Sequence, residues 1–166
     1  MPSDALRCAG PTSLSAEQAG IAAGVAAGVT CARVALLAAW PSFREANDRS
    51  NQQVLSPLRG PLDLAAVAAL PALSEELLFR GALLPTVYPD WRGAAVAGAV
   101  FGALHLGGGR NAAFAVWAGA VGCIYGVAFL GTGNLWVPAL AHAAANAAAG
   151  ALWLQQRAAD APKRKR

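Results

Sequence analysis

Two adjacent glutamates and an arginine lie inside a long apolar run of this chain, and that feature limits what the chain can fold into. The stretch PALSEELLFRGALLP (Pro71–Pro85) belongs to an apolar run from Leu62 to Leu84, which is long enough to cross a bilayer as a helix. Charges inside such a segment are costly and are usually retained for function. The alternative is a soluble amphipathic helix whose charges face water, and the composition separates the two interpretations.

The composition favours the membrane. Hydrophobic residues make up 56% of the 166 residues and charged residues only 13%, whereas soluble domains carry about 25% charged residues. A buried soluble core of this size would need a polar coat that this chain cannot supply. The net charge of +4 does not indicate nucleic-acid binding, because the basic residues are not interleaved with aromatic ones. The tail PKRKR (Pro162–Arg166) is typical of a cytoplasmic membrane-flanking cluster.

The apolar residues form five runs, and these predict an all-α, polytopic membrane helix bundle of about five transmembrane or re-entrant helices. The runs cover residues 19–40, 62–84, 94–106, 112–130 and 135–154. The third run is short, which favours a tilted or re-entrant helix. The polar stretch at 41–61 is expected to be a linker, because its prolines, asparagines and charges exclude a spanning helix. "TVYPDWRG" (residues 86–93) is expected to be a turn at the membrane boundary.

The same pattern predicts the domain organisation and the orientation. We expect a flexible segment at 1–18, one membrane-embedded helical domain at 19–156 with its motif core at 62–154, and a basic tail at 157–166. With the tail inside, the inner loops carry nine basic residues and the outer loops carry two, Arg7 and Arg92. This bias places the N-terminus outside and the 41–61 linker inside. Arg33, near the end of the first run, is expected to snorkel towards the interface.

Among the polar residues inside the apolar runs, six stand out, because isolated polar groups in hydrocarbon must find one another. They include both histidines of the chain and are Glu75, Glu76, Arg80, His105, His142 and Asn146. A single histidine on an apolar helix is more often a satisfied core residue than a catalyst. Several such groups on three runs favour one buried site where the second, third and fifth runs meet.

Helical geometry assigns different tasks to the two glutamates. Glu76 and Arg80 are four residues apart on one face, which predicts an ion pair. Glu75 lies about 100° around the helix from Glu76, so it points elsewhere and stays available as a base. Burial raises the pKa of a carboxylate towards neutrality, which suits general acid–base work.

Two further motifs have the same four-residue spacing. FGALH places Phe101 and His105 on one helix face, and Gly98 and Gly102 beside them allow another helix to approach closely. HAAAN places His142 and Asn146 on one face. Pro138 precedes His142 by four residues and is expected to bend that helix towards the site by removing a hydrogen bond.

In these motifs the chain resembles the CPBP family, the CAAX-processing-type intramembrane proteases, also described as CAAX prenyl protease 2-like or CAAX amino-terminal proteases. EELLFR (Glu75–Arg80), FGALH (Phe101–His105) and HAAAN (His142–Asn146) are similar to the EExxxR, FxxxH and HxxxN motifs of that family, in the same order. The stretch from SNQQVLSPL through the first motif is also similar to plant and algal plastid members.

The resemblance implies an intramembrane endopeptidase that cleaves a membrane-associated protein or peptide. It implies that Glu75 and His105 activate a water and that His142 and Asn146 stabilise the oxyanion. Glu76 and Arg80, together with Phe101, would then support the site structurally. The resemblance implies a multi-pass protein of a chloroplast membrane or a bacterial-type inner membrane, with the bilayer as its surroundings and no nucleic-acid partner.

The residues alone allow a second possibility, in which a zinc ion serves as cofactor. Glu75, His105 and His142 could form a His₂Glu zinc set with an open fourth position. The chain has no HExxH motif, and these ligands would come from three separate helices. We therefore expect a glutamate-activated water with no cofactor.

Two readings from other functional classes remain open at this level. A non-catalytic membrane scaffold could keep the same motifs as a polar network that locks its helices. A small transporter or channel could use His and Glu as a proton relay. A channel should carry a polar stripe along several helices, whereas these polar residues cluster at three points.

Overall fold

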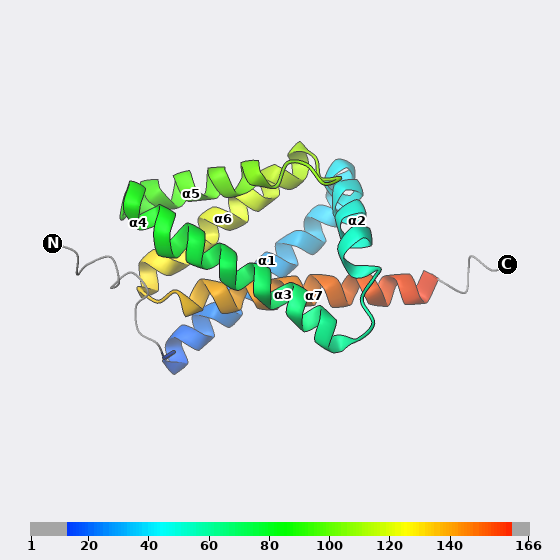
Figure 1. The fold of residues 1–166 in the computed structure, drawn as a ribbon, viewed down its shortest axis with the longest axis horizontal. Helices are drawn as coiled ribbons and strands as arrows, with labels where there is room; N and C mark the ends of the chain where they lie inside the picture. Colours follow the sequence, from blue (N-terminus) through cyan, green and yellow to red (C-terminus); the bar gives the residue numbers. More distant parts are fainter. Residues whose placement is uncertain (1–12, 161–166) are drawn as a thin grey trace.

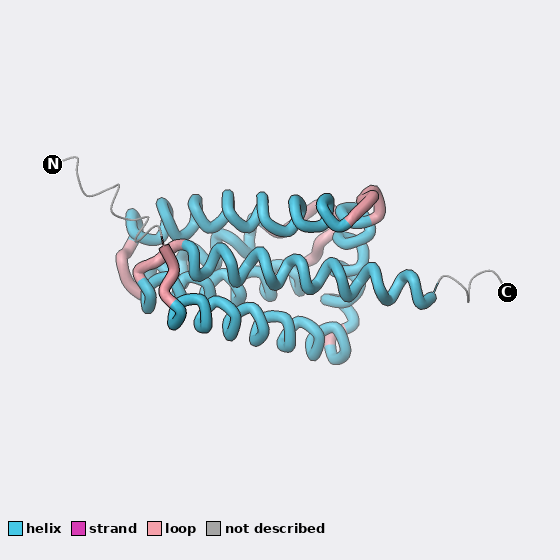
Figure 2. Tube along the Cα trace, turned by 90° about the horizontal axis from the view of Figure 1, so that it is seen from below, coloured by secondary structure: helices cyan, strands magenta, loops and turns pink. Residues whose placement is uncertain are grey.

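A computed structural model describes residues 13–160, and within them the chain forms only helices, joined by short turns (Figures 1 and 2). The elements are α1 (Ala16–Ala39), α2 (Pro41–Leu55), α3 (Pro61–Glu76), the π-helical segment η2 (Leu77–Leu83), α4 (Leu84–Val87), α5 (Trp91–Leu104), α6 (Ala112–Thr132) and α7 (Trp136–Asp160). The expected all-α bundle is confirmed.

Within residues 13–160, three helices are long and apolar enough to cross a membrane, namely α1, α6 and α7, and α5 is a shorter apolar helix. Large apolar side chains cover much of the outer surface: Leu62 is 83% exposed, Leu104 68% and Val116 63%. A soluble protein rarely leaves so many large apolar side chains in water. The long apolar helices and this outer surface fit a bundle surrounded by lipid.

Small residues set the distance between α5 and α6. A Cβ atom built on Gly102 would lie 2.6 Å from the carbonyl oxygen of Ala115, and one built on Gly98 would lie 2.9 Å from that of Gly119. The two helix backbones therefore touch directly, as in other membrane helix pairs with small residues four apart. The close approach expected at Gly98 and Gly102 is confirmed, and it fixes the position of His105 at the end of α5.

The prediction of a linker at 41–61 is wrong in one respect. Most of this polar stretch forms the 15-residue helix α2. Pro41 occupies the first turn, where a missing N–H costs nothing. Phe43, Ala46 and Leu55 are buried, while most of the remaining residues are polar. The helix crosses one end of the bundle (Figure 1) and contacts α1, α6 and α7.

The second apolar run continues as a helix beyond Pro85, where the sequence had predicted an end. α3, η2 and α4 follow one another without a break, and α4 ends at Val87. Pro85 has no N–H, and its ring crowds the carbonyl four residues before it. A wider π-turn immediately before the proline relieves that clash. The predicted turn at residues 86–93 shrinks accordingly, and α5 already begins at Trp91.

The two ends of the bundle differ in charge, as the predicted alternation of the runs requires. The helix α2, the segments at 56–60 and 105–111 and the end of α7 share one end (Figures 1 and 2). This end, called the basic end below, carries Arg44, Arg49, Arg59, Arg110 and Arg157.

At the opposite end Asp90 caps the N-terminus of α5 and accepts hydrogen bonds from the side chain and backbone of Arg92, which lower the pKa of Asp90. The predicted flexible segment and basic tail lie outside the described residues, apart from residues 13–18 and 157–160. Residues 16–18 already belong to α1, and residues 157–160 belong to α7.

Candidate active site

The predicted ion pair between Glu76 and Arg80 is present and completely buried. Nη1 of Arg80 lies 3.0 Å from Oε1 of Glu76, and both side chains are 0% exposed. Nη2 of Arg80 donates to the carbonyl of Gly122 on α6, at 2.5 Å. The guanidinium also lies 5.4–5.8 Å from the ring centres of Phe79, Phe101 and Tyr125. This cation therefore ties α3 and η2 to α5 and α6.

His142, on α7, contacts both glutamates of α3. Its Nδ1 lies 2.9 Å from Oε1 of Glu76, and its Nε2 lies 3.8 Å from Oε2 of Glu75. An ionised carboxylate only accepts hydrogen bonds, so Nδ1–H donates to Glu76 and fixes the ring. Tyr125 stacks on the other side of the imidazole, with 4.9 Å between the ring centres. Neither Tyr125 nor the contact between His142 and Glu76 could be predicted from local sequence patterns.

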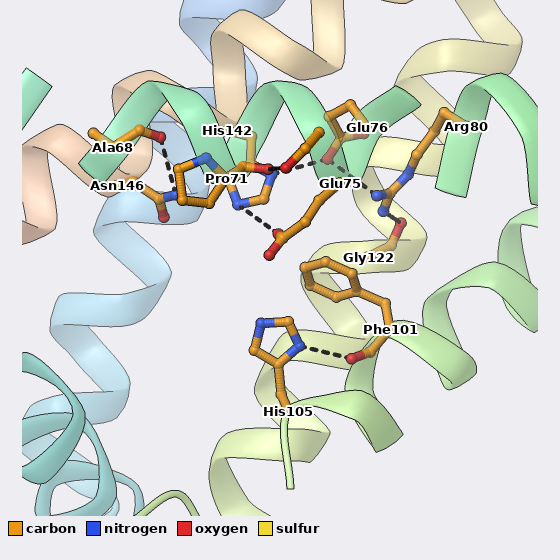
Figure 3. Close-up of polar contacts among 11 residues, drawn as sticks. Ala68, Pro71, Glu75, Glu76, Arg80, Phe101, His105, Gly122, His142 and Asn146 are labelled. Atoms are coloured by element: carbon orange, nitrogen blue, oxygen red, sulfur yellow. Dashed lines mark hydrogen bonds and ion pairs between the residues drawn. The ribbon is translucent and has the colours of Figure 1, made fainter. Parts of the chain in front are cut away.

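Glu75 and Glu76 have different surroundings although they are adjacent in the chain. The Glu75 side chain is 29% exposed, whereas that of Glu76 is fully buried. Figure 3 shows the Glu75 carboxylate between the rings of His142 and His105, pointing away from Arg80. The angular separation expected from the helix is therefore confirmed.

His105 lies just beyond the last residue of α5 and caps that helix. Its Nδ1 is 2.7 Å from the carbonyl oxygen of Phe101. A carbonyl oxygen only accepts, so Nδ1–H is the donor, and Nε2 keeps its lone pair in the neutral ring. The ring also packs on Phe101, with 4.4 Å between centres. Phe101 therefore holds the ring in place, and Nε2 stays free to accept a hydrogen bond.

Asn146 lies one turn beyond His142 on α7, and its Nδ2 donates to the carbonyl of Ala68 on α3 at 3.4 Å. A primary amide has two N–H donors, so one of them is left over. Pro138 does not bend α7 as expected. It is the third residue of the helix, where its N–H would have had no helical partner in any case.

One cavity of about 200 Å³ is lined by Glu75, His105, His142 and Asn146 together. Two arginines, Arg33 and Arg110, also line it, as do residues 50–51 and 54–55 of α2. The cavity therefore lies beneath α2, at the basic end. Arg33 does not simply snorkel, because its Nη2 donates to Oδ1 of Asn47 on α2. The position of Arg33 inside an apolar run is the sequence feature that could have indicated its place in the site.

Zinc binding depends on how the candidate ligands are grouped. The Nδ1 atoms of His142 and His105 donate to Glu76 and to the Phe101 carbonyl, which leaves both Nε2 atoms open, as in histidines that bind metals. Among residues 13–160, no three His, Cys, Asp or Glu side chains are grouped as a metal site would require. As placed, Glu75, His105 and His142 do not fit a zinc ion, and no step below uses one.

Comparison with known proteins gives one match. Residues 57–148 match the family of Rce1-like proteins, described as type II CAAX prenyl endopeptidase Rce1-like. The match covers just over half of the chain and contains all three motifs. No curated protein and no solved structure matches the chain.

Proposed function

The chain belongs to the Rce1-like family of type II CAAX prenyl endopeptidases, and from this premise we propose that it is an intramembrane endopeptidase that uses a glutamate-activated water. The family is a protease family, and the apolar helices make the chain an integral membrane protein. Its substrate is a protein or peptide associated with the bilayer.

The observation that carries the proposal is the shared cavity. Glu75, His105, His142 and Asn146 come from α3, the end of α5 and α7, and all four line the same space of about 200 Å³. A structural network needs its polar groups paired with one another. Here one carboxylate and one imidazole nitrogen remain directed at a space large enough for water and part of a peptide.

Glu75 acts as the general base in this proposal. The water donates one hydrogen bond to the Glu75 carboxylate and one to Nε2 of His105. Glu75 takes a proton from the water as the oxygen attacks the peptide carbonyl carbon. The proton then passes to the leaving nitrogen as the C–N bond breaks, giving a carboxylate and an amine. Proton transfer by a positioned group contributes about 10²- to 10⁴-fold in rate.

His142 and Asn146 serve the oxyanion. The spare N–H of Asn146 and a protonated Nε2 of His142 donate to the oxygen that becomes negative during attack. Preorganised donors of this kind are worth about 10²- to 10³-fold each. Glu76 holds His142 through Nδ1, and Arg80 holds Glu76. These two residues position the site without touching the substrate.

The substrate is best sought among membrane-anchored peptides, including prenylated peptides that end in a CAAX sequence, because the family is named for them. Other membrane peptides are equally within the proposal. We still predict that the protein lies in a chloroplast membrane or a bacterial-type inner membrane.

The test uses the purified protein in phosphatidylcholine vesicles prepared in water enriched in ¹⁸O. One vesicle set carries a farnesylated peptide ending in a CAAX sequence, and the other carries N-palmitoylated peptides of randomised sequence. Hydrolysis predicts fragments whose new carboxylate contains one ¹⁸O, formed by the wild type and not by Glu75→Gln. Wild-type protein that is folded yet cleaves neither set above the Glu75→Gln background would overturn the proposal.

A further inference from the structure

Arg33 is half-buried and has no acidic partner. Its Nη2 donates to Oδ1 of Asn47, a side chain that is itself 2% exposed. No carboxylate of the described residues comes within 4.0 Å of its guanidinium nitrogens. A half-buried cation with a single neutral hydrogen bond is only partly compensated, and charges shielded from water are normally paired. An anion that entered the neighbouring cavity would supply the missing charge.

The position of Arg33 connects that missing charge to the candidate active site. Arg33 lines the cavity of about 200 Å³ that contains Glu75, and it also lines a second cavity of about 350 Å³ between α1, α2 and α7. Asn51 and Ala149 border both cavities as well. A peptide whose scissile bond lies at Glu75 can therefore extend past Arg33 beneath α2.

The charges around the smaller cavity favour an anionic guest. Arg80 neutralises Glu76 by direct contact. Glu75 is then the single negative side chain on the wall, and it faces two arginines, Arg33 and Arg110. The larger cavity adds Arg44 and one carboxylate, Asp48, and Asp48 is not paired with Arg33.

We propose that Arg33 binds a carboxylate of the peptide substrate and thereby selects which peptide bond reaches Glu75. This inference rests on the proposed function and adds a specificity-determining residue to it. Arg33 is preferred to Arg110 for two reasons. Asn47 holds its guanidinium in place, and Arg33 lines both the cavity that contains Glu75 and the larger cavity between α1, α2 and α7. Arg110 lies in a glycine-rich turn and packs over the Phe114 ring, with 5.5 Å to its centre.

The carboxylate can come from the C-terminus of the peptide or from an Asp or Glu side chain, and three peptide pools separate these sources. All pools are N-palmitoylated, randomised and carried in phosphatidylcholine vesicles. The first has free C-terminal acids and contains no Asp or Glu. The second is identical but ends in C-terminal amides. The third also ends in amides but contains Asp and Glu.

The wild type is expected to cleave the first or the third pool about 10- to 100-fold more efficiently than the second, as the loss of one charged hydrogen bond predicts. The difference should appear mainly in KM, because binding is what the carboxylate supplies. Arg33→Gln should lower the cleavage efficiency of the favoured pool to that of the second pool. It should not change the cleavage efficiency of the second pool. Arg33→Lys should keep most of the preference.

Arg49→Gln is the matched control, because Arg49 is also an arginine of the basic end but pairs with Glu45, is 51% exposed and lines neither cavity. This variant should cleave all three pools at the wild-type rates. Equal cleavage of the three pools by the wild type would overturn the inference and leave the proposed function standing, and this comparison needs no variant to fold. A preference lost in Arg110→Gln but kept in Arg33→Gln would overturn it too.

A lipid phosphate is the competing guest for the guanidinium. If phosphatidylglycerol in the vesicles stimulated all pools equally in the wild type and not in Arg33→Gln, Arg33 would be a lipid site and the inference would be wrong. The absence of any Glu75-dependent cleavage would instead refute the proposed function itself.

Discussion

His142 donates its Nδ1–H to Oε1 of Glu76 across 2.9 Å, and the same oxygen accepts a hydrogen bond from Arg80 at 3.0 Å. The three residues come from α7, α3 and η2, so one buried carboxylate joins the helix that carries Glu75 to the helix that carries Asn146. The second glutamate of the motif therefore has two tasks. It neutralises Arg80, and it turns the other nitrogen of His142 towards Glu75.

Replacing Glu76 tests its role in holding the bundle. Glu76→Gln leaves Arg80 charged, buried and without its counter-ion, which typically costs about 3–5 kcal/mol. We expect a loss of this size in the free energy of unfolding, measured by chemical unfolding in detergent micelles. Glu75→Gln is the matched control, and it should change the unfolding free energy by much less because Glu75 is 29% exposed. Similar losses in both variants would contradict the different tasks assigned to the two glutamates.

Gly102→Ala tests the close contact between α5 and α6. The added methyl group would meet the carbonyl oxygen of Ala115 at 2.6 Å, so the helices must separate. Overpacking of this kind costs about 1–3 kcal/mol. Gly28→Ala is the control, because a Cβ on Gly28 in α1 meets nothing within 4 Å, and it should be neutral or slightly stabilising. If thermal unfolding gave equal midpoints for the two variants, the contact would not be needed for stability.

Removal of the two donors on α7 should slow hydrolysis without unfolding the protein. We expect Asn146→Ala to lower kcat by about 10²- to 10³-fold, the usual effect of losing one oxyanion donor. The one hydrogen bond of Asn146, to the Ala68 carbonyl, is long at 3.4 Å. The unfolding midpoint of Asn146→Ala should therefore be close to that of the wild type. His142→Ala should lower kcat at least as far. A change in KM alone for Asn146→Ala would argue against a role at the oxyanion.

The orientation in the membrane can be tested with single cysteines at the two ends of the bundle. Ser56 is exposed directly after α2, at the basic end, and Pro89 is exposed between α4 and α5, at the opposite end. The excess of basic residues places the basic end in the cytoplasm. In a variant without the three native cysteines, a membrane-impermeant thiol reagent added outside intact cells should label Pro89→Cys and not Ser56→Cys. The reverse labelling pattern would invert the predicted topology.

Much of the bundle could be predicted from hydropathy, because apolar runs of bilayer length have few other ways to satisfy their backbone. The Glu76–Arg80 pair followed from its four-residue spacing, and the close contact at Gly98 and Gly102 followed from their size. These features depend on residues near one another in the chain or on a single helix face.

The features that sequence reasoning missed depend on contacts between distant segments. Helix α2 was expected to be a linker because its residues are polar, yet Phe43 and Ala46 are both 0% exposed against the bundle end. Tyr125 stacks on His142, although nothing in its neighbourhood indicated a place in the site. Pro138 was expected to bend a helix, but its effect depended on where that helix begins. No local spacing encodes these relationships.

Glu75 is assigned as the base and Glu76 is not, and a comparison of cleavage rates tests this assignment. The initial rate of peptide cleavage in vesicles is measured for wild type and Glu75→Gln, with equal amounts of protein verified as folded by their unfolding midpoints. Glu75→Gln should keep the wild-type midpoint and lose at least about 100-fold in rate, the lower bound for general-base catalysis. A folded Glu75→Gln protein that retains more than about a tenth of the wild-type rate would contradict it.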